Sequence, residues 1–216
     1  MAALEAGAWL VIPAADGAHA RRLVGRLAAG EEAERPLLCG EEGGLPPAGY
    51  DLGNSPAAFT PARVANRVVV YRTSNGTPLM HRVRASARLR VACFRNAEAV
   101  AAAVADDIAG GATPDGVAIA CAGRRGRLSM DDAWSAGHLV ERIARRLAAP
   151  LLTDGARAAA ELASRLGVPT AERLGETAAG RALGHLGLAE DLAPCAALDH
   201  SRVVPLWRSH GFVKGG

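Results

Sequence analysis

The sequence has few of the features that identify common functional classes. Aromatic residues make up only 4% of its 216 residues, so a core of this size must be built from Ala, Leu and Val. Lysine occurs once, at Lys214, and the net charge is only +3. That charge is far from the basic surface of a nucleic-acid-binding protein, so we expect no nucleic-acid partner.

Cysteine usage and the N-terminus exclude further classes. Cys39, Cys93, Cys121 and Cys195 are far apart, with no Cys-x-x-Cys pair and no histidine at ligand spacing. This pattern argues against a structural zinc site and a disulfide framework, and it is typical of free thiols in a reducing compartment. The first apolar stretch has no basic segment before it and contains Pro13. Both features argue against a signal peptide and against a membrane span. We expect a cytoplasmic protein with no membrane partner.

Signatures of nucleotide binding and of serine hydrolases are also missing. The sequence has no G-x-x-x-x-G-K-[S/T] and no G-x-G-x-x-G motif. Its six histidines are scattered, and none pairs with Ser or Cys in a recognisable triad order.

What the sequence does contain is an alternation of short apolar runs and amphipathic stretches through residues 1–150. The predicted strands are residues 8–12, 37–39, 67–72, 88–94 and 117–121. The predicted helices are residues 17–29, 97–105 and 130–147. This alternation is typical of an α/β fold, layered α/β/α with a mostly parallel sheet.

The pattern changes after about residue 150. Helices are predicted over residues 154–166, 178–186 and 189–198, followed by a short hairpin of residues 202–207 and 211–213. No Ser/Gly-rich linker separates this region. We expect residues 151–216 to be a helical flank with a terminal hairpin, and not an independent domain.

Three polar loops stand out from this background. They are GYDLGNSP at residues 49–56, SNGT at residues 74–77 and CAGRRGRLSMDD at residues 121–132. Ligands of α/β folds bind at the carboxyl ends of the strands, where these loops are predicted to lie. Carboxylates, amides and hydroxyls beside glycines suit a polar ligand, and helix starts after such loops suit an anion such as phosphate.

Each loop residue also has a structural explanation. Thr77 could cap the helix after an ordinary Asn-Gly turn, and Asn96 could cap the helix that follows it. Ser129 and Asp132 have the spacing of a capping box, although adjacent carboxylates beside arginines could equally bind a divalent metal and a phosphate ester. Glu41 is either a metal ligand or a solvated loop charge.

Five segments resemble the 2-phosphosulfolactate phosphatase family. They are GYDLGNSP, TSNGT, FRNAEAV, CAGRRGRLSMDDAWSAG and EDLAPCAALDHSRVVP. The resemblance runs in order over nearly the whole chain, from about residue 6 to residue 213. The resemblance implies a magnesium-dependent phosphatase that removes phosphate from the 2-hydroxyl of short carboxylic acids, classically phosphosulfolactate on the way to coenzyme M.

The chain departs from the family pattern in three places. Family members carry an additional strand with an Asp-x-x-Arg-Ala-Thr-like segment before the stretch that matches residues 2–13, and we expect it to be missing here. The family segment Gly-Glu-Arg-Gly-Gly corresponds to residues 40–44 of this chain, where Glu42 replaces the arginine. The family also has a Thr-rich run before Asn-Gly-Thr, and this chain has Arg72-Thr73-Ser74 there. Either the start lies upstream or the chain is a divergent paralogue, and an incomplete sheet favours a homodimer.

The leading hypothesis is a phosphatase acting on a small anionic phosphoester with magnesium. Glu41 and Asp131 are the predicted metal ligands, and Asp51 or Asp132 is the predicted nucleophile or base, with Cys121 as a less favoured nucleophile. The predicted substrate-binding residues are Asn54, Ser55, Thr73, Ser74, Asn75, Gly76, Thr77, Asn96, Arg125 and Ser129. The alternative is a non-catalytic anion-binding paralogue that keeps the pocket but not the chemistry.

Overall fold

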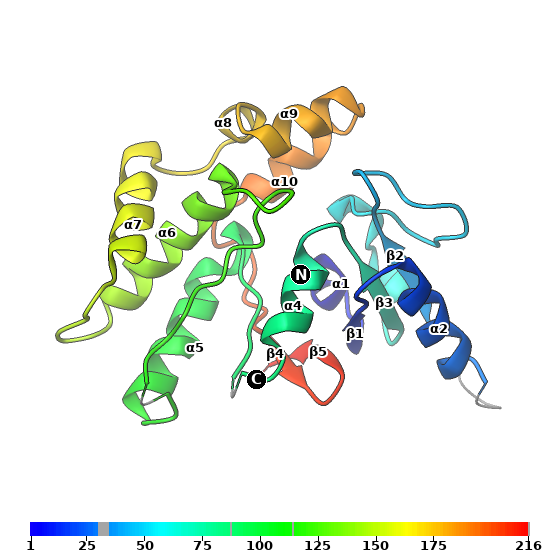
Figure 1. The fold of residues 1–216 in the computed structure, drawn as a ribbon, viewed down its shortest axis with the longest axis horizontal. Coiled ribbons are helices and arrows are strands. Elements are labelled where there is room, and N and C mark those ends of the chain that lie inside the picture. The colour runs from blue at the N-terminus through cyan, green and yellow to red at the C-terminus, as the bar shows by residue number, and fades with distance from the viewer. Residues whose placement is uncertain (30–34, 87, 114, 216) are drawn as a thin grey trace.

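The computed structural model describes residues 1–29, 35–86, 88–113 and 115–215. Within these residues, five strands form one sheet in the order β2-β3-β1-β5-β4 (Figure 1). The strands are β1 (Leu10–Pro13), β2 (Leu37–Gly40), β3 (Val68–Arg72), β4 (Pro205–Arg208) and β5 (Gly211–Lys214). The β2-β3-β1 core is parallel, and the β4-β5 hairpin adds to it antiparallel to β1. The mostly parallel core and the terminal hairpin are thus confirmed.

The central strand β3 shows why the fold is layered. Val69 and Val70 are both fully buried, but alternation along a strand sends their side chains to opposite faces. Val69 belongs to a cluster with Phe59 and Val64, whereas Val70 packs with Ala20 of the helix on the other face. Helices therefore cover both faces of this part of the sheet, as the α/β/α prediction requires.

The predicted helices form close to their ranges. Along the chain the helices are α1 (Ala2–Glu5), α2 (Gly17–Leu27), α3 (Pro61–Val64), α4 (Gly76–Val83), α5 (Ala97–Ala109), α6 (Met130–Ala144), α7 (Asp154–Leu166), α8 (Ala171–Gly175), α9 (Ala178–His185) and α10 (Leu192–Ala196). However, residues 189–198 give a 3₁₀ turn followed by the short α10, and α1, α3 and α8 were not predicted. Asp16, Thr153 and Thr177 cap α2, α7 and α9 by accepting backbone N–H groups, which fixes where these helices begin. No helix among the described residues has both the length and the apolar character needed to cross a membrane.

The helices after α4 form a second core beside the sheet. Figure 1 shows α5, α6 and α7 on one side of the molecule and α2 with β1–β3 on the other. Phe94, Trp134 and Ala163 are buried together in this second core. At Gly137 of α6, an added Cβ would lie 2.0 Å from the Ala159 carbonyl oxygen, so the glycine permits close packing of α6 on α7. This packing fixes the position of the helix that carries Asp131 and Asp132.

Two predicted strands are wrong. Residues 88–94 form only an isolated bridge between Arg90 and Leu206 before a 3₁₀ turn, Phe94–Asn96. Residues 117–121 form no regular element and are all exposed, including Val117 and Ile119. Their apolar composition favours a strand, but a strand also needs a neighbour for its backbone N–H and C=O groups, and no described segment pairs with residues 117–121.

Candidate functional site

Three helices begin around one hollow in the protein surface. The hollow, here named the acidic pocket, has a volume of about 230 Å³. Its walls come from the ends of β2 and β3 and from the starts of α4, α6 and α9. The lining residues are Glu41, Asn54, Thr73, Asn75, Gly76, Ala122, Gly123, Arg124, Ser129, Asp131, Asp132 and Ala179. The pocket thus lies at the carboxyl ends of two parallel strands, where α/β folds bind ligands.

Glu41 fixes one wall of the acidic pocket. Its buried carboxylate accepts hydrogen bonds from the backbone N–H of Ser74 at 2.6 Å, the hydroxyl of Ser74 at 3.1 Å and the N–H of Gly44 at 2.8 Å. These bonds tie the loop after β2 to the loop after β3. The solvated-charge explanation is therefore excluded, because the carboxylate holds two loops together.

The loop after β3 is closed by a reciprocal pair of threonines. Thr73 N–H donates to Thr77 Oγ1 and Thr77 N–H donates to Thr73 Oγ1, each at 3.0 Å. The prediction that Thr77 caps the helix is wrong, because α4 begins at Gly76 with Asn75 at its N-cap, and the buried Thr77 lies in its first turn. Thr73, Asn75 and Gly76 line the pocket. The loop therefore presents Asn75 and the start of α4 from a fixed backbone, at the helix end that favours an anion.

Asp131 and Asp132, at the start of α6, also line the acidic pocket. The capping box predicted for Ser129 and Asp132 does not form. Ser129 makes no capping hydrogen bond and donates instead to Asp131 Oδ1, whereas Asp132 Oδ2 accepts the N–H of Gly123 at 2.6 Å. Burial raises the pKa of Asp132 above its ordinary value, and the adjacent carboxylate of Asp131 raises it further against the lowering effect of the Gly123 N–H. Each aspartate has one carboxylate oxygen engaged, by Ser129 in Asp131 and by Gly123 in Asp132.

The donor set of the acidic pocket limits how a metal could be held. Among the described residues, no three His, Cys, Asp or Glu side chains meet in a geometry that holds a metal ion unaided. Asp131 Oδ2 and Asp132 Oδ1 nevertheless have no hydrogen-bond partner in the described part of the chain. Magnesium is commonly bound through one or two carboxylates, with substrate oxygens and water completing its shell. The two aspartates fit that mode of binding.

A tight turn beside the acidic pocket presents three arginines. Arg124 and Arg127 pair across it through two backbone hydrogen bonds of 2.9 and 3.0 Å, and Arg125 and Gly126 both have positive φ angles, 51° and 74°. These features define a type I′ turn. The N–H of Arg125 donates to Asn75 Oδ1 at 3.1 Å, which fastens the turn to the loop after β3. At Gly123 an added Cβ would lie 2.6 Å from the Arg127 carbonyl oxygen, so glycine is required there.

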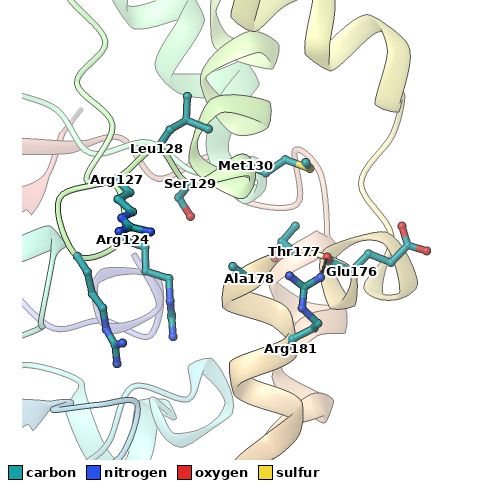
Figure 2. Close-up of a pocket in the computed structure, with 10 residues that line it drawn as sticks. Arg124, Arg127, Leu128, Ser129, Met130, Glu176, Thr177, Ala178 and Arg181 are labelled. Carbon is teal, nitrogen blue, oxygen red and sulfur yellow. Dashed lines mark hydrogen bonds between the residues drawn. The ribbon is translucent and has the colours of Figure 1, made fainter.

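This turn forms one side of a second, larger hollow, here named the arginine pocket. Its volume is about 760 Å³, and it shares Arg124 and Ser129 with the acidic pocket. Figure 2 shows Arg124 and Arg127 on one side of the opening and Arg181, from α9, on the other. Arg181 donates to the carbonyl oxygen of Glu176, and the Glu176 carboxylate is turned away from the arginines of the turn (Figure 2).

Asp51 lies outside both pockets, although it was a predicted catalytic residue. One carboxylate oxygen accepts from Leu38 N–H at 2.7 Å, and the other pairs with Arg35 at 2.5 Å. Desolvation alone would raise the pKa of Asp51, but the hydrogen bonds from Arg35 and Leu38 outweigh it and lower the pKa. This placement supports a structural role, tying the GYDLGNSP loop to β2.

Four predicted substrate-binding residues also line neither pocket: Ser55, Ser74, Thr77 and Asn96. Ser74 and Thr77 are engaged in the hydrogen bonds that hold the loop after β3. Asn96 is fully buried, accepts from Cys93 N–H at 2.9 Å and donates to the carbonyl oxygens of Val91 and Val203. Ser55 donates to Asp191, 136 residues further along the chain. Both side chains hold segments together. Asn54 from the same loop does line the acidic pocket.

Cys121, the less favoured nucleophile, is not among the residues that line the acidic pocket. Desolvation and the carboxylates of Asp132 and Asp131 raise the pKa of its thiol. A raised pKa leaves less thiolate, which is the nucleophilic form.

The sequence reasoning missed the contribution of α9. Ala179 lines the acidic pocket and Arg181 the arginine pocket, although both come from the C-terminal helical region. It also selected only Arg125 from the arginine turn. The signal that was available is the RRGR segment itself, because two arginines flank an Arg-Gly pair that can form a type I′ turn.

Comparisons with known proteins agree with this geometry. A family model described as 2-phosphosulpholactate phosphatase matches residues 1–210. Three relatives named probable 2-phosphosulfolactate phosphatase come from Thermus thermophilus, Deinococcus radiodurans and Pseudothermotoga lettingae.

The first two relatives are 41% and 39% identical over 177 and 183 residues, covering 81% and 83% of this chain and 71% and 72% of the relatives. The third is 31% identical over 213 residues, covering 98% of this chain and 85% of the relative. Since the family model spans nearly the whole chain and its segments carry both walls of the acidic pocket, the chain belongs to the 2-phosphosulfolactate phosphatase family.

Proposed function

We propose that this protein hydrolyses the 2-phosphate ester of a small hydroxy acid similar to 2-phosphosulfolactate, with magnesium as its cofactor. The observation that carries the proposal is the acidic pocket. Asp131, Asp132, Asn75 and Gly76 all line it, and α4 and α6 both begin there. Two helix starts favour a phosphate group, and two carboxylates favour the cation that neutralises it.

The side chains of the acidic pocket have distinct roles in this proposal. Asn75, Ser129 and the N–H of Gly76, the first residue of α4, orient the phosphate oxygens. Asp131 would hold magnesium, which would neutralise charge on the phosphoryl group, and Asp132 beside it remains as the base. Arg124, which lines both pockets, adds a positive charge next to the phosphate.

Hydrolysis requires a water molecule and a base in line with the ester bond. Asp132 accepts a proton from the attacking water as the new P–O bond forms. The bond between phosphorus and the 2-oxygen breaks, and this oxygen takes a proton from solvent to give the 2-hydroxy acid and orthophosphate. Positioning and charge neutralisation account for most of the rate, as in phosphoryl transfer generally.

A second candidate is a non-catalytic protein that binds the same anions. It is favoured by the absence of a three-ligand metal group among the described residues and by the engagement of Glu41 in three hydrogen bonds. Glu41, a predicted metal ligand, would then serve only to join the loops after β2 and β3.

Phosphate release separates the two candidates. Purified protein is incubated with 2-phosphosulfolactate and with 2-phospholactate, with magnesium or with EDTA, and orthophosphate is measured. Thermal shifts with magnesium alone and with sulfolactate are recorded in parallel. The proposal predicts magnesium-dependent release and a thermal shift with magnesium that Asp131→Asn reduces. Stabilisation by sulfolactate without any phosphate release would favour the binding protein.

A further inference from the structure

We infer that the arginine pocket binds a second anionic group of the substrate, beyond the phosphate, and thereby selects organophosphates that carry a sulfonate or similar oxyanion near the ester carbon. This inference rests on the proposed function for its substrate class. It assigns Arg127 and Arg181 as specificity-determining residues.

The first observation is the charge of the arginine pocket. Four of its lining residues are arginines, and Glu176 is its single carboxylate. The guanidinium groups of Arg124, Arg125 and Arg127 make no hydrogen bond or ion pair with any residue that the structure describes. Several arginines elsewhere in the chain do pair with acids, as Arg95 does with Glu5 and Arg142 with Asp199. The pocket thus gathers positive charge, and the residues that the structure describes leave three of its four guanidinium groups without a partner.

The second observation is the geometry of the turn. Arg125 adopts a positive φ angle, a backbone conformation that a residue with a side chain rarely takes. Two backbone hydrogen bonds and the contact between Arg125 N–H and Asn75 hold this conformation. Arg124 and Arg127 are therefore presented side by side from a fixed turn, with Arg181 facing them from α9 (Figure 2).

The third observation is that the two pockets are contiguous. Arg124 and Ser129 line both, so a phosphate in the acidic pocket lies next to the arginines. Guanidinium groups bind sulfonate and carboxylate oxygens through charge-assisted hydrogen bonds. A ligand with two or three carbons between its phosphate and its sulfonate could place the phosphate in the acidic pocket and the sulfonate in the arginine pocket.

The test measures binding without requiring catalysis. Sulfolactate and lactate, which differ by the sulfonate, are titrated calorimetrically into wild-type protein, Arg127→Met, Arg181→Met and the control Arg26→Met, an exposed arginine of α2. The expected result is that wild type binds sulfolactate at least tenfold more tightly than lactate. Arg127→Met and Arg181→Met should each lose most of this difference, Arg127→Lys should restore part of it, and Arg26→Met should keep it.

A kinetic measurement separates the inference from the proposed function. With 2-phosphosulfolactate, the Arg127→Met and Arg181→Met variants should raise KM by about tenfold, the worth of a charged hydrogen bond, with little change in kcat. If no phosphoester is hydrolysed but the binding difference follows the arginines, the proposed function fails and the arginine site stands. Equal affinities for sulfolactate in wild type and both methionine variants would overturn the inference, whether or not phosphate is released.

Discussion

The acidic pocket and the arginine pocket share Arg124 and Ser129, yet their side chains are held in different ways. Around the acidic pocket, Glu41, Thr73 and Asp132 accept backbone N–H groups, so most polar side chains are fixed by the fold. Around the arginine pocket, only the backbone of the turn is fixed, and the long guanidinium side chains are exposed or half-exposed.

This difference matches two tasks within one site. Phosphoryl transfer requires groups that are already in place, because reorganisation during the reaction would cost rate. Recognition of a second anion tolerates side chains that move to meet it. The acidic pocket is therefore suited to the chemistry and the arginine pocket to substrate selection, and substitutions in each pocket test this division.

The largest effect is expected for Asp132→Asn. The amide cannot accept the proton of the attacking water, so kcat should fall by about 10²–10³-fold while KM changes little. Initial rates of phosphate release measure both parameters. The matched control is Asp154→Asn, an acid in the first turn of α7 outside both pockets. An unchanged kcat in Asp132→Asn would contradict the assignment of Asp132 as the base and of the acidic pocket as the site of hydrolysis.

The next effect concerns the rigidity of the acidic pocket. In Glu41→Gln an amide NH₂ replaces one of the oxygens that accept from the N–H groups of Ser74 and Gly44. That NH₂ is a donor and cannot accept from either N–H, so one hydrogen bond is lost. We expect the free energy of unfolding to fall by about 1–3 kcal/mol and turnover to fall with it.

Urea unfolding of Glu41→Gln and Glu42→Gln provides the comparison. The Glu42 side chain is 70% exposed and pairs with Arg72 at 3.4 Å, so its loss should cost less than about 1 kcal/mol. Similar stabilities for the two variants would mean that the wall around Glu41 is not held as described.

The smallest effect is expected for Asp51→Asn, a carboxylate outside both pockets. We expect kcat within about twofold of wild type, and a loss of about 1 kcal/mol in unfolding free energy, because the pair with Arg35 is partly exposed. The pKa of Asp51 is lowered in the fold, so its stabilising contribution is present above the ordinary Asp pKa near 4 and disappears as the pH falls through the lowered value.

Urea unfolding at pH 6 and near pH 3.5 measures that contribution. The stability difference between wild type and Asp51→Asn should be smaller at the lower pH. A large loss of kcat at pH 6 would instead restore Asp51 as a catalytic residue and break the division between the two pockets.

Local sequence signals predicted much of the fold because they act within a few residues. Caps such as Asp16 and Thr153 mark helix starts, and the valines of β3 indicate a strand that is buried on both faces. The segment at residues 117–121 shows the limit of such signals. Its apolar residues are typical of a strand, but pairing depends on which segment lies beside it, and composition alone does not contain that information.

The site was predicted in part for the same reason. Glu41, Asn75, Asp131 and Asp132 were found because they follow strands or begin helices, which places them at one edge of the sheet. Asp51 has the same sequence character, yet the fold engages it with Arg35, and only long-range geometry distinguishes the two cases. Arg181 could not be found by this reasoning, because α9 reaches the site only through the packing of the C-terminal helices.

The most direct test of the two-pocket site is a crystal structure of the Asp132→Asn variant with magnesium and 2-phosphosulfolactate, in which slow turnover preserves the ester. The account predicts the phosphate beside Asn75, Ser129 and Asp131, with the sulfonate between Arg127 and Arg181. A phosphate bound by the arginine turn, with neither substrate nor metal beside Asp131, would contradict it.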